Sequence, residues 1–314
     1  MDGVRERFGA AESEVLAAFG VAATSRFIDL PRSGRRVRIL ESGKGQTVLV
    51  LPGLGAVASF WAPLMAELPD LRLVALDRPG CGLSDPFDLR GDDVRTWLVK
   101  LIEELREALG GGRISLIGNS IGGTAALWYA MAHPEGVDRV VLIGAPPYVL
   151  DHQAPLPMRI LSIPAIARRA LKASSEKDVD VLFQRMGHRS GALSPELVRL
   201  VLAARTLPGY ADGYIGVLHG TTTLFGRRVS APAAELARLK TPTLLIWGDG
   251  DTHGSVETGR RMVATMPNAS LEVRGQGHLP WIDEPVACGK LIAGFFQNGE
   301  DVAAHRSGAR DVRP

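Results

Sequence analysis

Short apolar runs recur along the chain and predict buried strands. They lie at residues 37–40, 47–51, 71–76, 114–117, 139–143, 243–247 and 270–273. Most are bounded by Gly, Pro or Asp, which is typical of strands buried on both faces of a sheet. The clearest helical pattern between them is 92–109, where apolar residues recur on one face. Alternating strands and helices predict an α/β fold, with helices on both faces of a mostly parallel sheet.

One connection between strands is too long for a simple crossover. The segment 145–240 is roughly a hundred residues long, whereas a crossover needs about a dozen. Its helical patterns lie at 157–172, 179–186 and 195–204. The sequence therefore predicts a helical unit, residues 145–240, inserted into a core of residues 1–144 and 241–297, with a flexible polar tail at 298–314.

Composition and charge exclude several classes of protein. The 314 residues are 46% hydrophobic, with 36 Lys and Arg against 34 Asp and Glu. This balance excludes a disordered chain, and the net charge of +2 gives no overall footprint for nucleic acid. Cys81 and Cys288 cannot form a disulfide framework, and their spacing matches no metal site. We therefore expect a reducing compartment and no partner nucleic acid.

Two uncharged stretches, 45–66 and 114–134, imitate membrane spans but are interrupted by Pro and Gly, so we expect no membrane helix. The N-terminus mixes acidic and basic residues without an apolar signal core, which predicts a cytoplasmic protein. The charge is unevenly distributed, because segment 145–240 is basic and the remainder acidic. That excess either attracts an acidic substrate or lies on a solvated helical surface.

The second uncharged stretch contains a serine in a glycine-rich turn. Gly118-Asn119-Ser120-Ile121-Gly122 follows an apolar run and precedes a helical pattern at 124–132. This strand, turn and helix context is that of a nucleophile elbow, which exposes the serine hydroxyl at the carboxyl edge of the sheet. A lone G-x-S-x-G motif also occurs in ordinary turns, so the neighbouring motifs decide its meaning.

Two further loops follow earlier strands. Residues 51–55, Leu-Pro-Gly-Leu-Gly, lie where a backbone N–H can hold a developing oxyanion, although a simple Pro-Gly turn reads the same way. Residues 77–85 form a second rigid Gly/Pro loop. Cys81 lies inside it, and we interpret it as a small filler residue because no base is evident nearby.

A serine hydroxyl is a weak nucleophile, so it needs a base, and the base needs a buried carboxylate to orient it. The segment Trp247-Gly248-Asp249-Gly250-Asp251 ends one late strand, and His278 follows the last one. The order Ser120, Asp251, His278 is that of a nucleophile elbow and its partners. Each residue alone has an ordinary explanation, but three suitable types at strand ends in this order indicate a catalytic site.

Together these motifs resemble the α/β-hydrolase superfamily over about residues 30–297. The resemblance implies the α/β-hydrolase fold and makes the insert 145–240 an α-helical cap. It implies a small-molecule substrate and no metal or organic cofactor. An aspartate at the elbow would imply dehalogenation or epoxide opening through an alkyl-enzyme ester, and this chain has Ser120 there instead.

The same resemblance implies a role for each site residue. Ser120 is the nucleophile, His278 is the general base and then acid, and Asp251 orients the histidine. The backbone N–H groups of Leu54 and Ile121 form the oxyanion hole, each contributing roughly 3–4 kcal/mol of transition-state stabilisation.

The pattern departs from the superfamily at Pro52, where a His usually precedes the first Gly of the oxyanion loop. Asp249 competes as the orienting acid, and Asp151 is a weaker candidate. We favour Asp251 because the Trp-Gly-x-x-Asp spacing ends there. His253 is too close to Asp251 in sequence to act as the base, but it can line the rim of the pocket.

A serine nucleophile points to acyl transfer and thus to hydrolysis of a carboxylic ester, lactone or thioester. The alternative is C–C hydrolysis of vinylogous diketones, because the elbow is similar to the Gly-Asn-Ser-Met-Gly-Gly elbow of meta-cleavage-product hydrolases. Against it, Leu279 and not Trp follows His278, and the oxyanion loop is not Ser-Gly-x-Gly-like. A lyase, a cyclase or a small-molecule receptor on the same scaffold also remains open.

Overall fold

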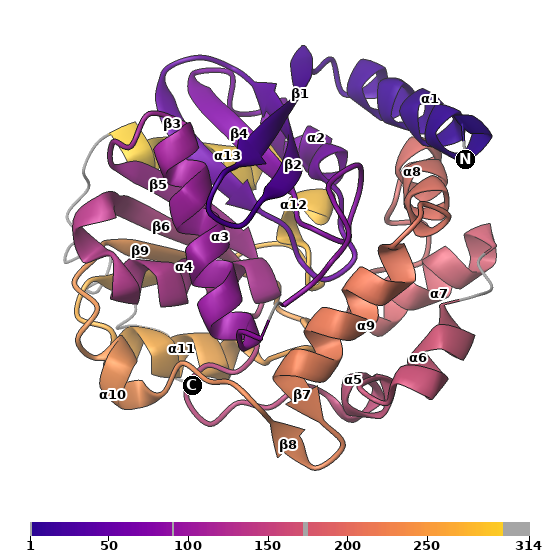
Figure 1. Ribbon diagram of the computed structural model, residues 1–314. Coiled ribbons are helices and arrows are strands. Elements are labelled where there is room, and N and C mark those ends of the chain that lie inside the picture. The colour runs from indigo at the N-terminus through magenta and orange to yellow at the C-terminus, as the bar shows by residue number, and fades with distance from the viewer. Residues whose placement is uncertain (1, 90, 172–174, 298–314) are drawn as a thin grey trace.

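The computed structural model describes residues 2–89, 91–171 and 175–297, and its centre is an eight-stranded sheet (Figure 1). The predicted tail at 298–314 lies outside the described residues. In spatial order the strands are β1 (Ala23–Leu30), β2 (Arg35–Ser42), β4 (Leu71–Asp77), β3 (Gln46–Leu51), β5 (Ile114–Asn119), β6 (Val137–Ile143), β9 (Thr243–Trp247) and β10 (Ala269–Val273). Strand β2 is antiparallel to both of its neighbours, and the strands from β4 to β10 are parallel. The predicted mostly parallel sheet is confirmed.

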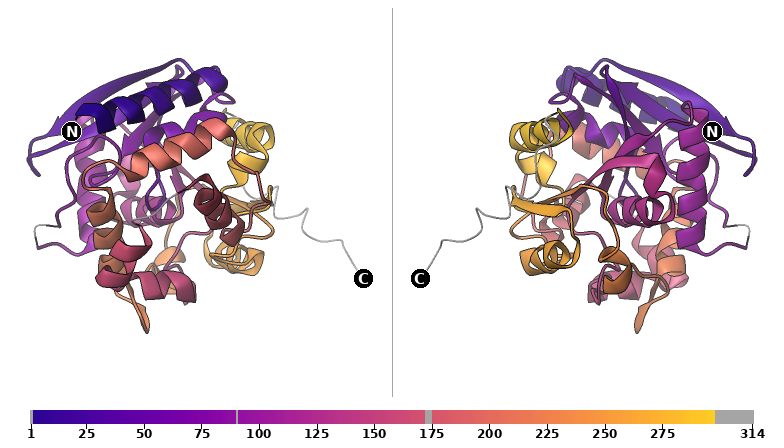
Figure 2. Two further views of the ribbon diagram at one scale, coloured as in Figure 1. Left: turned by 90° about the vertical axis from the view of Figure 1, so that its right-hand side faces the viewer. Right: turned by 90° about the vertical axis from the view of Figure 1, so that its left-hand side faces the viewer.

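Helices cover both faces of this sheet (Figure 2). In strand β3, Leu49 and Leu51 belong to one hydrophobic core and Val48 and Val50 to the other, because successive side chains point to opposite faces. One face carries α3 (Val94–Ala108), α4 (Ile121–Ala132) and α11 (Val256–Thr265), and the other carries α2 (Ala62–Met65), α12 (Pro280–Asp283) and α13 (Pro285–Gln297). No helix within the described ranges is both long and apolar enough to cross a bilayer.

The connection between β6 and β9 is helical, with several short elements. They are α5 (Leu156–Leu161), α6 (Pro164–Ala170), α7 (Glu176–Arg185), α8 (Pro195–Arg205), α9 (Tyr210–Thr221), the hairpin of β7 (Thr222–Thr223) and β8 (Gly226–Arg227), and α10 (Ala233–Leu236). The prediction of one helix over 157–172 is wrong. Ile163 is extended and Pro164 begins a new helix, because a residue before proline is disfavoured in the helical conformation.

The insert lies over the loops that follow the parallel strands. In α9, Gly213 packs on Gly80 after β4, and a Cβ at Gly213 would lie only 2.6 Å from the Gly80 Cα. After α7, the Met186 carbonyl accepts a hydrogen bond of 2.9 Å from the His278 N–H, in the loop after β10. The insert therefore sits at the carboxyl edge of the sheet, where the sequence places its candidate chemistry.

The pattern of hydrophobic and polar residues does not predict two N-terminal elements. Strand β1 has mostly exposed side chains, and helix α1 (Asp2–Ala18) packs against α8 of the insert. Helix α1 is joined to the sheet by Arg38, which is fully buried and contacts Glu12 at 2.5 Å and Asp77 at 3.4 Å. A buried guanidinium between two carboxylates is stable only while its partners remain, so this ion cluster holds α1 to β2.

We predict that Glu12→Gln lowers the free energy of unfolding by about 2–3 kcal/mol, because it removes one charge from a buried ion cluster while Asp77 remains. Glu14→Gln is the matched control on the same helix, since the Glu14–Arg199 pair is about half exposed and contributes less than about 1 kcal/mol. Urea unfolding of both variants measures the difference. Equal losses would contradict a special role for the buried cluster.

Candidate active site

Ser120 lies in the tight turn between β5 and α4. Its backbone has φ 53° and ψ −123°, a conformation that costs a non-glycine residue about 1–3 kcal/mol. The turn closes against strand β3, because a Cβ at Gly122 would lie 2.2 Å from the Leu51 carbonyl oxygen. The Ser120 hydroxyl is partly exposed in a cavity, and it has no hydrogen-bond partner among the residues that the structure describes. The strained turn thus presents an unpaired hydroxyl at the carboxyl edge of the sheet.

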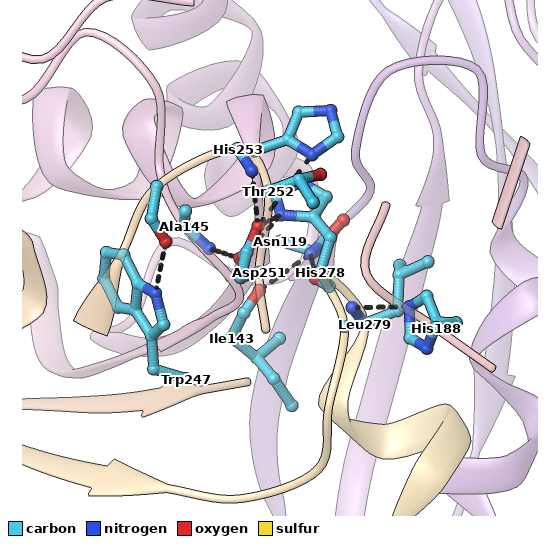
Figure 3. Close-up of polar contacts among 12 residues, drawn as sticks. Asn119, Ile143, Ala145, His188, Trp247, Asp251, Thr252, His253, His278 and Leu279 are labelled. Atoms are coloured by element: carbon cyan, nitrogen blue, oxygen red, sulfur yellow. Dashed lines mark hydrogen bonds and ion pairs between the residues drawn. The ribbon is translucent and has the colours of Figure 1, made fainter. Parts of the chain in front are cut away.

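The structure brings Asp251 and His278 into direct contact from the loops after β9 and β10 (Figure 3). The His278 Nδ1 lies 3.0 Å from one carboxylate oxygen and 2.9 Å from the other. The same carboxylate accepts hydrogen bonds of 2.8 Å from the N–H groups of Ala145 and His253. An Nδ1–H that donates to Asp251 leaves Nε2 of His278 free to accept a proton.

Asp251 is buried, and burial alone would raise its pKa. The neighbouring His278 and the backbone donors lower the pKa more, so that it lies below the usual value of an aspartate. The carboxylate therefore stays ionised near neutral pH. An ionised, fully hydrogen-bonded carboxylate is what a histidine base needs to hold one tautomer.

Neither competing acid reaches the histidine. Asp249 lies two residues away but is exposed. Asp151 is also exposed and pairs with Arg261 at 2.7 Å on the surface. Among the three aspartates that the sequence offers, the geometry thus places Asp251 alone beside His278.

Asn119 connects the serine turn to the histidine loop. Its Nδ2 donates to the Ile143 carbonyl at 2.7 Å and to the His278 carbonyl at 3.2 Å. The Asn119 side chain is buried, and Asn119 directly precedes Ser120 in the sequence. This one side chain therefore joins the serine turn to the histidine loop. Sequence reasoning treated Asn119 only as part of a motif, and its connecting role became visible only in the structure.

The insert also holds the histidine loop. Besides the contact between Met186 and His278, the Leu279 N–H donates to Nε2 of His188 at 3.2 Å. The other ring nitrogen of His188 donates to Asp283 at 3.1 Å, at the end of α12. Neither His188 nor Asp283 was predicted from the sequence. The two residues are 95 positions apart, and no local pattern indicates that they lie in contact.

A second histidine lies against the first. The ring of His253 stacks on that of His278 with centroids 4.1 Å apart and an angle of 22° between the planes (Figure 3). Burial, together with the nearby His278, lowers the pKa of His253 to about 3. His253 is therefore neutral at working pH, and it lines the same cavity as Ser120.

Donor atoms of Asp251, His253 and His278 lie within 4.8 Å of one another, which raises the question of a metal site. Imidazole and carboxylate are common ligands of zinc and similar ions. The two rings, however, stack face to face, and the carboxylate oxygens already accept N–H groups. Asp251 and His278 thus form a hydrogen-bonded pair, on which the His253 ring stacks. This arrangement fits the three residues better than a metal centre does.

The cavity at Ser120 is small and apolar, with a volume of about 40 Å³. It is lined by Leu54, Ser120, Ile121, Ala145, Pro147, Tyr148, Ala154, Pro155, Met158, Val217, Leu218, Thr221 and His253. No lysine, arginine, aspartate or glutamate occurs in this lining. The Tyr148 hydroxyl is already hydrogen-bonded to Thr221 and Thr222. The cavity thus offers a substrate mainly apolar contacts.

Only some of the aromatic and methionine side chains near the oxyanion loop and in the insert line this cavity. Phe60 and Trp61 are buried in the core, where Trp61 stacks on Trp281 at 4.3 Å. Tyr148 and Met158 do line the cavity, whereas Phe225 is 87% exposed. The lining does not include Phe183, Met186, Tyr210 or Tyr214.

A wider cleft of about 790 Å³ lies between α3, the end of α4 and the segment before β9. Several of its charges are paired, such as Arg95 with Glu235 and Arg113 with Asp138. The lining contains none of the residues Ser120, Asp251 and His278. The cleft is therefore separate from the candidate active site.

Comparison with known proteins identifies the family of this chain. A model of the alpha/beta hydrolase fold family matches residues 46–285, and the chain belongs to that family. It is 28% identical to a 2-hydroxy-6-oxononadienedioate/2-hydroxy-6-oxononatrienedioate hydrolase of Burkholderia vietnamiensis, with 88% of this chain and 96% of that protein covered. Relatives bearing the hydrolase name support a hydrolase.

Solved structures with the same fold include both esterases and meta-cleavage product hydrolases. The carboxylesterase CesB of Bacillus subtilis matches with a TM-score of 0.76 and 19% identity, over 95% of this chain and 99% of that one. A meta-cleavage product hydrolase of Pseudomonas fluorescens matches with a TM-score of 0.72 and 21% identity, over 88% of this chain and 98% of that one. At these identities the likeness shows the fold alone.

We predict that His253 makes the stability of the protein depend on pH. A histidine with a pKa of about 3 when folded and about 6.5 when unfolded binds its proton only in the unfolded state between these values. Stability therefore falls as the pH decreases below about 6.5, by about 1.4 kcal/mol per pH unit. Between about pH 7 and 5, wild type should lose about 2 kcal/mol more than His253→Phe, which keeps a stacked ring.

Urea unfolding of both proteins at several pH values measures this difference. Parallel pH curves for wild type and His253→Phe would show that His253 is protonated in the folded state as easily as in the unfolded chain.

Proposed function

We propose that this member of the α/β-hydrolase family is a serine hydrolase that cleaves esters of neutral, apolar carboxylic acids through an acyl-enzyme on Ser120. The observation that carries the proposal is the buried Asp251–His278 pair, with its carboxylate within 3.0 Å of Nδ1, at the same sheet edge as the strained serine. Nucleophile, base and orienting acid are the parts that acyl transfer requires.

In the proposed reaction, Nε2 of His278 removes the proton from the Ser120 hydroxyl as its oxygen bonds to the ester carbonyl carbon. The resulting oxyanion accepts hydrogen bonds from the N–H groups of Leu54 and Ile121. Ile121 begins helix α4, so its N–H has no partner within the helix, and Leu54 lines the same cavity. The C–O bond then breaks, and the alcohol leaves with the proton from His278.

A water molecule completes the cycle. His278 removes its proton while the water oxygen attacks the acyl carbon, and Ser120 regains a proton as the acid departs. The stacked ring of His253 stays neutral, so it does not compete with His278 for the proton that moves in either half of the reaction. Every proton and electron pair is accounted for by the chain, the ester and water.

In this proposal the insert 145–240 acts as a cap that covers the site. Its residues supply Met158, Val217 and Leu218 to the cavity wall. A volume of about 40 Å³ is far below the 300–1,000 Å³ or so of ordinary ligand pockets. Substrate entry therefore requires these cap side chains to move outward, and the acyl group that fits is small.

C–C hydrolysis is the second candidate, because curated relatives that match 88% of this chain are named 2-hydroxy-6-oxononadienedioate/2-hydroxy-6-oxononatrienedioate hydrolases. The acids in those names are dioates, each with two carboxylates. The cavity of this chain has no lysine or arginine in its lining to pair with a carboxylate. A buried carboxylate without a partner is costly, so the lining favours a neutral ester.

We predict that a fluorophosphonate labels Ser120 in wild type and not in Ser120→Ala. Ester turnover should fall by at least about a thousandfold in Ser120→Ala and by about a thousandfold or more in Asp251→Asn, because the histidine loses its preferred tautomer. Asp249→Asn is the matched control, and its rate should stay within about twofold of wild type because exposed substitutions have small effects. Mass spectrometry and a nitrophenyl ester assay read out both results.

Labelling without turnover on any ester would instead favour a receptor on this scaffold. Equal losses in Asp249→Asn and Asp251→Asn would contradict the assignment of the orienting acid. Absence of labelling in wild type would reject Ser120 as the nucleophile.

A substrate comparison separates the two candidate reactions. We predict that kcat/KM for a short neutral ester exceeds that for its analogue with an acyl carboxylate by about a hundredfold, because the cavity cannot pair the charge. A ring-fission diketone with a carboxylate should be turned over more slowly still. Preference for the diketone over both esters would establish the C–C reading in place of ester hydrolysis.

A further inference from the structure

Arg78, directly after β4, is a buried arginine without an acidic partner. It is only 2% exposed, and no carboxylate in the described part of the chain lies within 4.0 Å of its guanidinium. Its Nη2 donates to the Cys81 sulfur at 3.3 Å. Its Nε and Nη1 are buried and have no hydrogen-bond partner among the described residues.

Arg38 provides a comparison within the same molecule. It is as deeply buried as Arg78, but its guanidinium contacts the carboxylates of Glu12 and Asp77 and its Nε donates to Ser25. Burying a cation without such partners is strongly unfavourable. Arg78 therefore lowers the stability of the folded chain. A residue of this kind is kept where its charge serves a function.

The position of Arg78 indicates where that charge acts. Arg78 lines a cavity of about 10 Å³ together with Pro52, Ile121 and Gly122. Such a volume holds about one water molecule and is too small for a substrate group. Pro52 lies two residues before Leu54, and Ile121 follows the serine, so Arg78 shares this cavity with the segments that carry both proposed oxyanion donors.

A second contact joins Arg78 to the oxyanion loop. The Cys81 thiol, which accepts from Arg78, also interacts electrostatically with the backbone of Gly55, next to Leu54. Burial raises the pKa of this thiol, so it stays protonated and is not itself a nucleophile. Arg78, Cys81 and Gly55 thus form one continuous contact from the buried charge to the loop.

We infer that Arg78 is a positioning residue of the oxyanion hole, whose unpaired positive charge stabilises the negative charge that develops on the substrate oxygen during acyl transfer. The inference rests on the proposed function, because it needs an oxyanion at Ser120. A fixed positive charge in a site of low dielectric stabilises a negative charge that appears only in the transition state. It therefore accelerates the reaction without tightening substrate binding. In the resting enzyme the same charge has no carboxylate within 4.0 Å among the described residues.

The test replaces Arg78 with Met, which has a similar length and no charge, and with Lys, which keeps the charge. In Arg78→Met, kcat and the rate of fluorophosphonate labelling should fall by about ten- to a hundredfold, while KM stays within about threefold. The urea midpoint should be unchanged or higher, because an unpaired buried charge is removed. Arg78→Lys should recover part of the lost rate. Arg38→Met, the matched control, should instead lower the urea midpoint.

The outcomes distinguish the inference from the proposed function. Wild type that neither labels nor turns over esters overturns the proposed function and the inference with it. Wild type that labels, with Arg78→Met labelling equally fast, overturns the inference alone. An Arg78→Met variant that loses stability together with activity, or does not fold, shows that Arg78 is a structural residue and also overturns the inference.

Discussion

The hydrogen bonds between His278 and Asp251 join two loops that no local interaction would hold together. The carboxylate is buried, and it stays ionised only because His278 and the N–H groups of Ala145 and His253 surround it. Removing a carboxylate from water is costly unless such donors replace the lost hydration. The loops after β6, β9 and β10 must therefore keep their relative positions, and the parallel sheet beneath them provides that rigidity.

The insert has a larger role than covering the site. The Met186 carbonyl and the His188 ring both hold the backbone of the histidine loop, and α9 packs on the loop after β4. The same segment supplies part of the apolar wall beside Ser120. If the insert moves to admit a substrate, as proposed, these contacts couple its movement to the position of His278. In this proposal the cap both admits the substrate and holds His278, the base. Substrate binding is thereby linked to proton transfer by His278.

Two buried arginines illustrate how one fold uses the same side chain in opposite ways. Arg38 lies between carboxylates and connects α1 to the sheet, so its charge is fully compensated. Arg78 contacts Cys81 near the proposed oxyanion loop, and no carboxylate in the described part of the chain lies within 4.0 Å of its guanidinium. Functional sites are where proteins keep polar groups that their stability alone would reject. The proposed oxyanion hole is consistent with this pattern.

The sequence by itself determined the mostly parallel sheet, the position of the insert and the candidates Ser120, Asp251 and His278. These features follow from apolar runs, glycine-rich turns and residue order, which are local properties of the chain. Only the tertiary structure decided between Asp249 and Asp251 as the neighbour of His278, and only it revealed the connections made by Asn119 and His188. It also split the predicted helix 157–172 and added β1, whose exposed side chains carry no apolar pattern. The reason is physical: burial, hydrogen-bond geometry and an unpaired charge depend on which distant segments meet, and single-sequence patterns record only neighbours.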